Sequence, residues 1–173
     1  MTFRPFVCTS FVSLLAVSLL SGCGSQPRPA DLPPLYPCTV MVTQGGQPLS
    51  EGIVRLVSED PSFKWAVFAQ LNSSGTGKMF TQGLYAGAPE GDYKVVISKE
   101  EEVVEEAGPT VVRQGEFGEE TFTPTRIMVY SLVEKEYAEA ETTPLTITVG
   151  KKGNDQKFEC GTSVRELLRT VTP

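Results

Sequence analysis

The sequence predicts an all-β fold, an antiparallel β-sandwich of about seven to eight short strands. Two observations predict it. Apolar residues recur at every second position over short runs, which is the spacing of a strand with one buried face. Turn sequences rich in Gly, Pro and Asn separate these runs at intervals of about 8–12 residues, as in sandwich proteins. The chain of 173 residues is long enough for one domain with a sizeable core.

The strand with the clearest alternation is expected to direct Tyr93, Val95 and Ile97 toward the core and Val96 toward solvent. The Gly-containing stretch 151–154 is expected to be a hairpin loop between the last two strands. All expected strands lie in a sandwich domain that covers 38–161, and they cover 38–43, 52–58, 63–69, 78–82, 93–98, 126–130, 145–149 and 156–160.

One stretch inside the domain, 99–124, breaks the alternation. It is rich in Glu, Gly and Pro, and its only pairs of adjacent apolar residues are Val103-Val104 and Val111-Val112. We therefore expect a long exposed acidic loop with at most a loose hairpin. Its first part could hold calcium, but the sequence lacks the Asp-x-Asp-x-Asp-Gly spacing, and a solvated loop is the preferred interpretation. The glutamates concerned are Glu100, Glu101, Glu102, Glu105 and Glu106.

The C-terminal tail, 162–173, changes period. Val164, Leu167, Leu168 and Val171 stand at i, i+3, i+4 and i+7, the spacing of one face of a helix. Ser163 and Glu166 also have the spacing of a capping box. The tail is therefore expected to form a short amphipathic helix packed on the sandwich, with a docking helix for a partner as the alternative.

The sequence of residues 1–22 is typical of a bacterial lipoprotein signal peptide. Arg4 precedes an apolar run that is shorter than the ~20 residues of a spanning helix. The run ends in a lipobox formed by Leu20, Ser21, Gly22 and Cys23, in which the Cys23 thiol would accept the lipid. An ordinary secretory signal and an uncleaved helix are the alternatives. Five prolines then make 23–37 an extended tether.

This signal predicts an exported protein that is held on the bacterial cell envelope by its acyl chains. Two or more chains anchor stably, because each buried methylene contributes about 0.8 kcal/mol. The residue after the lipidated cysteine is Gly24, whereas Asp at that position is the usual signal for retention at the inner membrane. Gly24 therefore favours the outer membrane in a bacterium with two membranes.

Composition excludes several classes of function. The chain contains no histidine, which removes Ser-His-Asp and Cys-His catalysis and the commonest zinc ligand. Its formal net charge is −6, and no basic stripe is present, which argues against nucleic acid as a partner. We therefore expect a protein that is not an enzyme, without catalytic residues, a metal site or a cofactor.

Several turn motifs resemble one family. They are the sequences VTQGGQPL at 42–49, NSSG at 72–75 and GAPEGDYKVVI at 87–97, with the strand 52–57 between the first two. Together they resemble the carboxypeptidase-regulatory-like, transthyretin-like domain, an Ig-like sandwich. The stretch 133–146 is also similar to small envelope lipoproteins that carry this domain. The resemblance implies a folded accessory or interaction module and no catalytic residues.

Cys38 and Cys160 open the first expected strand and close the last one. In the strand order that the resemblance implies, these two ends fall at the same end of the sandwich. A disulfide between the cysteines is therefore the expectation in an exported protein, with two buried free thiols as the alternative.

The function expected from the sequence is a lipid-anchored binding or structural module that contacts another envelope protein. The loop 99–124 and the tail 162–173 are the expected contact elements. A glycan-binding module is the alternative, if Trp65, Tyr85, Tyr93 and Tyr130 line one face. A hydrolase with a carboxylate pair is the least favoured hypothesis.

Overall fold

The structure is a computed structural model that describes residues 28–115 and 118–172. The predicted lipobox, Leu20 to Cys23, lies outside the described residues. The chain divides into two compact units, Met1–Leu32 and Pro33–Pro173. In the described end of the first unit, the backbone N–H of Leu32 donates to the carbonyl of Pro29 at 3.2 Å. All strands of the described residues belong to the second unit.

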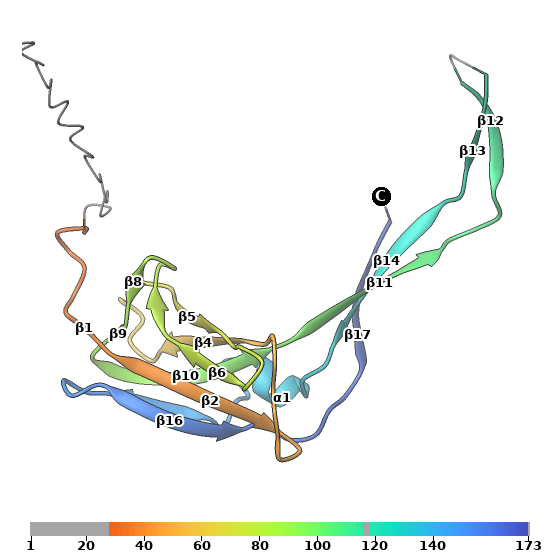
Figure 1. Cartoon of the computed structure of the whole chain (residues 1–173). Coiled ribbons are helices and arrows are strands. Elements are labelled where there is room, and N and C mark those ends of the chain that lie inside the picture. Colours follow the sequence, from red (N-terminus) through yellow and green to blue (C-terminus); the bar gives the residue numbers. More distant parts are fainter. Residues whose placement is uncertain (1–27, 116–117, 173) are drawn as a thin grey trace, which may run out of the picture. The chain divides into compact units, whose positions relative to one another are not determined.

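The second unit is all-β, as predicted, but it has more strands than predicted (Figure 1). Some strands are only two residues long, and others lie in 99–124 and in the C-terminal tail. The strands are β1 (Leu35–Tyr36), β2 (Cys38–Gln44), β3 (Gln47–Pro48), β4 (Ile53–Ser58), β5 (Val67–Gln70), β6 (Thr76–Lys78), β7 (Phe80–Thr81), β8 (Tyr85–Ala86), β9 (Ala88–Pro89), β10 (Gly91–Ser98), β11 (Glu100–Glu106), β12 (Val111–Gly115), β13 (Gly118–Phe122), β14 (Thr125–Ser131), β15 (Thr146–Val149), β16 (Asn154–Glu159) and β17 (Glu166–Val171). The one helix of the described residues is α1 (Lys135–Ala138).

Two sheets form the sandwich. One has the order β15-β10-β4-β5-β7-β8, and the other has the order β16-β2-β3, with β6 also paired to β2. Every pairing is antiparallel except that of β2 with β16, which is parallel. The core lies between the sheets, because side chains of both belong to one buried cluster. Its members include Cys38, Val40, Val42, Val54, Leu56, Val67, Met79, Tyr93, Val95, Ile97, Ile147, Val149, Phe158 and Cys160.

The predicted alternation in β10 is confirmed for the inward side chains. Tyr93, Val95 and Ile97 are at most 1% exposed. The prediction for Val96 is wrong: this side chain is 3% exposed. Val96 lies on the opposite face of the strand, where it lines a groove together with α1 residue Ala138. The α1 segment therefore covers part of a face that the sequence pattern assigned to solvent.

The predicted hairpin at 151–154 is wrong. A turn is present, since the N–H of Gly153 donates to the carbonyl of Gly150 at 2.9 Å. However, β15 pairs with β10 and β16 pairs with β2, so the turn crosses from one sheet to the other. A hairpin and a connection between two sheets both place turn residues between strands with period-2 alternation. The sequence pattern therefore did not distinguish the two.

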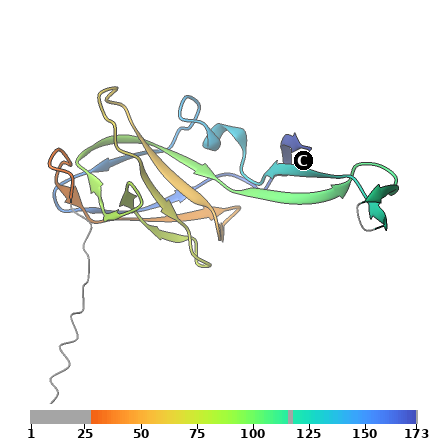
Figure 2. The ribbon, with the colours of Figure 1, turned by 90° about the horizontal axis from the view of Figure 1, so that it is seen from above.

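The stretch 99–124 is not an irregular loop. It is exposed, but β11 pairs with β14 over seven residues, and β12 pairs with β13 (Figures 1 and 2). Lys99 alone separates β10 from β11. Because most side chains of these strands are exposed, no apolar alternation marks them as strands.

The prediction of a C-terminal helix is also wrong. Residues Glu166–Val171 form β17, which pairs with β14 (Figure 1). A helix this short needs a buried face to be stable in water, and all six residues are exposed. The edge of β14 supplies backbone hydrogen-bond partners instead. The apolar residues with helical spacing therefore do not form the buried face of a helix. We call β11 to β14 together with β17 the arm.

Candidate functional site

Cys38 and Cys160 are free, buried thiols, which corrects the disulfide expectation. Because β2 and β16 run parallel, Cys38 stands opposite Asn154, and Cys160 follows six residues later. The N–H of Cys160 donates to the carbonyl of Thr43, at the far end of β2. At about 3.3 Å per residue the two thiols lie roughly 20 Å apart, whereas a disulfide needs Cα atoms within about 7 Å.

Both thiols are expected to be inert in the folded protein. Burial raises the pKa of Cys38 to about 11, with the charge of Asp155 adding to the shift, and burial raises the pKa of Cys160 to about 11. At pH 8 the native protein should therefore leave both cysteines unmodified by iodoacetamide, while the unfolded protein should be alkylated at both without a reductant. Mass spectrometry of the two cysteine peptides checks this. A disulfide-linked Cys38–Cys160 peptide would contradict the parallel register.

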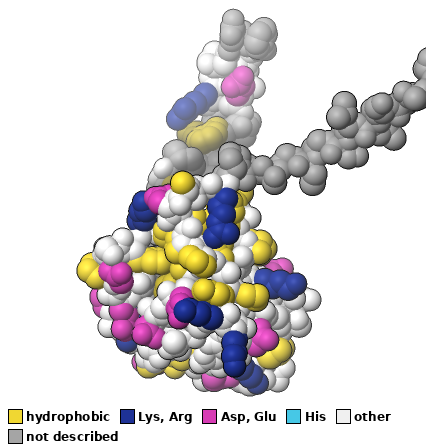
Figure 3. Space-filling view, turned by 90° about the vertical axis from the view of Figure 1, so that its left-hand side faces the viewer, with side chains coloured by type: hydrophobic (Ala, Val, Ile, Leu, Met, Phe, Trp, Pro, Cys, Tyr) yellow, Lys and Arg dark blue, Asp and Glu magenta, His cyan; other side chains and the backbone are white. Residues whose placement is uncertain are grey.

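The arm carries most of the large apolar side chains that the described chain exposes. These side chains are Val104, Val111, Val112, Phe122, Leu167, Leu168 and Val171, each between 42% and 65% exposed. The sandwich exposes fewer large apolar side chains, namely Met41, Ile53, Phe68, Phe80 and Leu84. Figure 3 shows one end of the sandwich, where the hydrophobic side chains are interrupted by acidic and basic ones.

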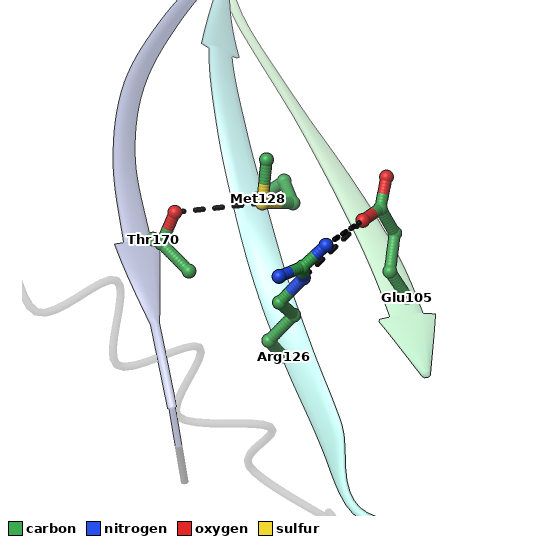
Figure 4. A network of polar contacts seen from close by, with 4 residues as sticks. All are labelled: Glu105, Arg126, Met128 and Thr170. Atoms are coloured by element: carbon green, nitrogen blue, oxygen red, sulfur yellow. Dashed lines mark hydrogen bonds and ion pairs between the residues drawn. The ribbon is translucent and has the colours of Figure 1, made fainter. Parts of the chain in front are cut away.

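Ion pairs join the strands of the arm. Arg126 of β14 donates to Glu105 of β11 at 2.9 Å, and beside it the hydroxyl of Thr170 donates to the sulfur of Met128 at 3.4 Å (Figure 4). These contacts link all three strands of the sheet β11-β14-β17.

Two more arginines connect the C-terminal part of the chain to β11. Arg165 pairs with Glu101 at 2.9 Å, and Arg169 pairs with Glu100 at 3.0 Å. The guanidinium of Arg165 also lies 4.0 Å from the centre of the Tyr130 ring, within the range of a cation–π interaction. Exposed pairs are weak one by one, so their main effect is to fix which strands lie together.

Other carboxylates of the arm form no ion pair within the described residues: Glu102, Glu106, Glu119, Glu120 and Glu166. Arg113 stands opposite Glu120 in the ladder of β12 and β13, so one of the five has a cation nearby. The arm therefore presents an excess of negative charge next to exposed apolar side chains. The arginines that form the ion pairs of the arm were not predicted from the sequence. A signal was present, because 100–106 contains five glutamates and 165–169 contains two arginines.

The two outer edges of the arm sheet differ. β11 forms one edge, and five of its seven residues are glutamates. β17 forms the other edge with the sequence ELLRTV, which contains neither Lys nor Pro. Within residues 28–115 and 118–172, β14 is the only strand that pairs with β17. One edge is therefore protected by like charges against further pairing, and the other is less protected.

Two grooves adjoin β17. The larger has a volume of about 450 Å³ and lies between the outer face of β4 and β10, α1 and Leu168. The smaller, of about 230 Å³, is lined by α1 and by Glu166, Leu167 and Leu168. The ladder between β14 and β17 has a bulge, since Val129 stands opposite Arg169 and Tyr130 opposite Leu167. Leu168 is the extra residue, and it lines both grooves.

The segment that leads into β17 is held by Glu134. Its carboxylate accepts hydrogen bonds from the backbone N–H and the hydroxyl of Thr162, both at 2.8 Å. The side-chain amide of Gln44 donates to the carbonyl of Leu132 at 2.9 Å and to that of Thr162 at 3.2 Å. These bonds place the start of the tail beside the end of β14.

The bonds to Glu134 predict a pH dependence. The hydrogen bond from the Thr162 N–H, followed by that from its hydroxyl, holds the pKa of Glu134 below its ordinary value of 4.5. A depressed pKa means that the contribution to stability is present above pH 4.5 and is lost as the pH falls through the folded-state pKa. Glu134→Gln should therefore reduce the loss of thermal stability on acidification. Thermal unfolding from pH 6 to pH 3 measures this. The control Glu119→Gln, which removes a carboxylate without a hydrogen bond among the described residues, should leave the loss unchanged.

The aromatic residues considered for glycan binding do not share one face. Tyr93 is buried, and its hydroxyl donates to the carbonyl of Pro89 at 2.9 Å. Tyr130 lies on the arm under Arg165, and Tyr85 lies in β8. Trp65 lines an open groove of about 580 Å³ together with Asp60, Phe63, Glu139 and Glu141.

Within the described part of the chain, no group of three or more acidic or cysteine side chains is arranged to hold a metal ion. The acidic residues considered for calcium instead form the β11 edge, where alternate residues face opposite sides of the sheet. The described residues also include no helix that is long and apolar enough to span a membrane. No known family, curated protein or solved structure matches the chain.

Proposed function

We propose that the protein is a lipid-anchored, non-enzymatic module of the bacterial cell envelope that binds another protein through its arm. In this proposal Cys23 carries the lipid, 23–37 is the tether, and the sandwich is a transthyretin-like, carboxypeptidase-regulatory-like scaffold. The observation that carries the proposal is the composition of the arm surface. It combines the seven exposed apolar side chains with five carboxylates that form no ion pair among the described residues.

Large apolar side chains that gather on an exposed surface mark interaction sites. The β12–β13 hairpin adds a second argument. It is a two-stranded sheet with mainly exposed side chains, and isolated hairpins are only marginally stable in water. Its apolar pair, Val111 opposite Phe122, and the nearby Arg113 at 5.5 Å from the Phe122 ring give it local order. A partner that covers this hairpin would stabilise it further.

Photo-crosslinking in the native host tests the proposal. A photoreactive amino acid is placed at Val112, Phe122 or Leu168 on the arm, and at Met41 or Leu84 as matched exposed positions on the sandwich. The proposal predicts a protein adduct of defined mass from the arm positions that is absent from the sandwich positions. Adducts from the sandwich positions alone would overturn it.

Glycan binding is the second candidate, and one observation bears on it. Trp65 lies in an open groove with three carboxylates and Arg55. Since the other aromatics do not join it on one face, we place glycan binding behind protein binding. Binding to envelope glycans that is lost in Trp65→Ala and kept in an arm variant would reverse this order.

A further inference from the structure

The outer edge of β17 is an unpaired strand edge. β17 stands at the end of the sheet order β11-β14-β17, so the backbone groups on its other side have no strand partner among the described residues. All six of its residues are exposed, with Leu167, Leu168 and Val171 between 44% and 49%. An exposed apolar edge of this kind is a template for pairing with another chain.

Two features favour this edge over the β11 edge of the same sheet. The β11 edge is dominated by carboxylates, which disfavour the addition of a strand. The β17 edge instead adjoins two grooves, of about 450 and 230 Å³, in which side chains of an added strand can be seated. In strand addition the main-chain hydrogen bonds provide affinity, and pockets for alternate side chains provide specificity.

Charge indicates the chemistry of the partner. Glu166 lies at the start of β17 and lines the smaller groove, and it has no ion pair among the described residues. Lys135 lines the same groove, but it pairs with Glu139 at 3.8 Å. A second copy of this chain would bring the same unpaired Glu166 to the contact, and the chain as a whole carries a net charge of −6. A segment with basic residues neutralises this charge instead.

We propose that β17 binds an extended segment of a partner protein by strand addition, and that this segment is mainly apolar with a basic residue at the end that meets Glu166. This inference rests on the proposed function of the arm. The backbone of the segment pairs with the outer edge of β17. Its apolar side chains enter the grooves beside Leu168, and its terminal basic side chain faces Glu166, which lines the smaller groove.

A defined peptide tests the proposal. The probe is an eight-residue peptide with lysine at both ends and valines between them, added to protein that is expressed from the full-length sequence and purified in mild detergent. Two control peptides are used. One has glutamate in place of lysine, and the other keeps the lysines but is N-methylated on the backbone positions of one edge, which removes the donors needed for strand pairing.

Amide hydrogen exchange is the readout. With the peptide at ten times its Kd, exchange of the outward-facing amides of β17 should slow about tenfold, and β11 should be unaffected. Neither control peptide should produce this protection. Protection by the N-methylated peptide, protection on β11 alone, or no protection anywhere would overturn the proposal.

A pair of matched variants tests the role of charge. Glu166→Gln should weaken binding of the valine–lysine peptide by about twofold to fivefold, the range for one exposed ionic contact. Glu119→Gln removes an equally unpaired carboxylate from β13, away from β17, and should leave the affinity unchanged. Equal losses in the two variants would show that the peptide responds to net charge alone and would overturn the proposal.

Two outcomes separate this inference from its alternatives. Concentration-dependent dimers in which β17 is protected without peptide would show that a second copy covers the edge, and strand addition by a basic partner would be wrong. Crosslinks from the arm in cells, combined with no peptide effect on β17, would also reject strand addition but would leave the protein-binding role of the arm intact.

Discussion

Tyr93→Ala is expected to lower the free energy of unfolding by about 3–5 kcal/mol, the range for removing a large buried aromatic side chain. Tyr93 is 1% exposed in the middle of the sandwich core. Its ring packs edge-on against Phe63, with 5.6 Å between ring centroids. Its hydroxyl donates to the carbonyl of Pro89 at 2.9 Å, which ties β10 to the short strand β9. The change removes all of these contacts and leaves a cavity between the sheets.

Tyr93→Phe separates the hydroxyl from the ring. It keeps the packing but leaves the buried Pro89 carbonyl without this donor, which should cost about 1–3 kcal/mol. Tyr130→Phe is the matched control, because Tyr130 is on the arm with its ring under Arg165 and should lose less than about 0.5 kcal/mol. Urea unfolding followed by tyrosine and tryptophan fluorescence measures all three variants. Equal, small losses for both phenylalanine variants would contradict a buried hydrogen bond at Tyr93.

Gly75→Ala should be the second large effect, a loss of about 2–5 kcal/mol. Gly75 has a φ of +70°, which costs an L-residue about 1–2 kcal/mol. A Cβ at this position would also lie 2.5 Å from the carbonyl oxygen of Val42, which cannot move freely because β2 is paired on both sides. This crowding adds a cost of about 1–3 kcal/mol.

Gly46→Ala isolates the steric part of that effect. Gly46 has a similar φ of +77°, but a Cβ there would meet no atom within 4 Å. This variant should therefore lose only about 1–2 kcal/mol, the cost of the backbone conformation. The comparison is made by urea unfolding of both variants. If Gly75→Ala were no more destabilising than Gly46→Ala, the close approach of the Asn72–Gly75 turn to β2 would be wrong.

The sandwich was predictable because one face of each strand is buried. Burial imposes the period-2 pattern, so Tyr93, Val95 and Ile97 were correctly placed in the core. The same reasoning failed at Val96, where α1 covers the second face of β10. When a segment distant in sequence buries the second face of a strand, the apolar alternation within the strand does not reveal it.

In the arm, the strand predicted at 126–130 is present as β14, which buries Val129 and Ser131. The other strands of the arm were not predictable because they lack a buried face. In β11 and β17 the residue types are set by cross-strand ion pairs and by exposure, and no alternation results. At the tail, four apolar residues happened to have helical spacing. Tertiary pairing with β14 overrode that local preference.

The cysteine prediction failed for a topological reason. The sequence placed Cys38 at the start of the first strand and Cys160 at the end of the last; in the structure Cys38 begins β2, and Cys160 directly follows β16. Whether such ends meet depends on the relative direction of β2 and β16. Their parallel pairing puts the two thiols at opposite ends of the sheet.

The proposals for the arm depend on residues 166–171 being a strand of the sheet β11-β14-β17. Solution NMR of the isotope-labelled protein tests this most directly. The structure predicts extended-chain carbon chemical shifts for Glu166–Val171 and cross-strand proton contacts that join Arg169 to Val129 and Thr170 to Met128. Helical shifts across 164–171, with no contacts to β14, would contradict it, and the free edge at β17 would not exist.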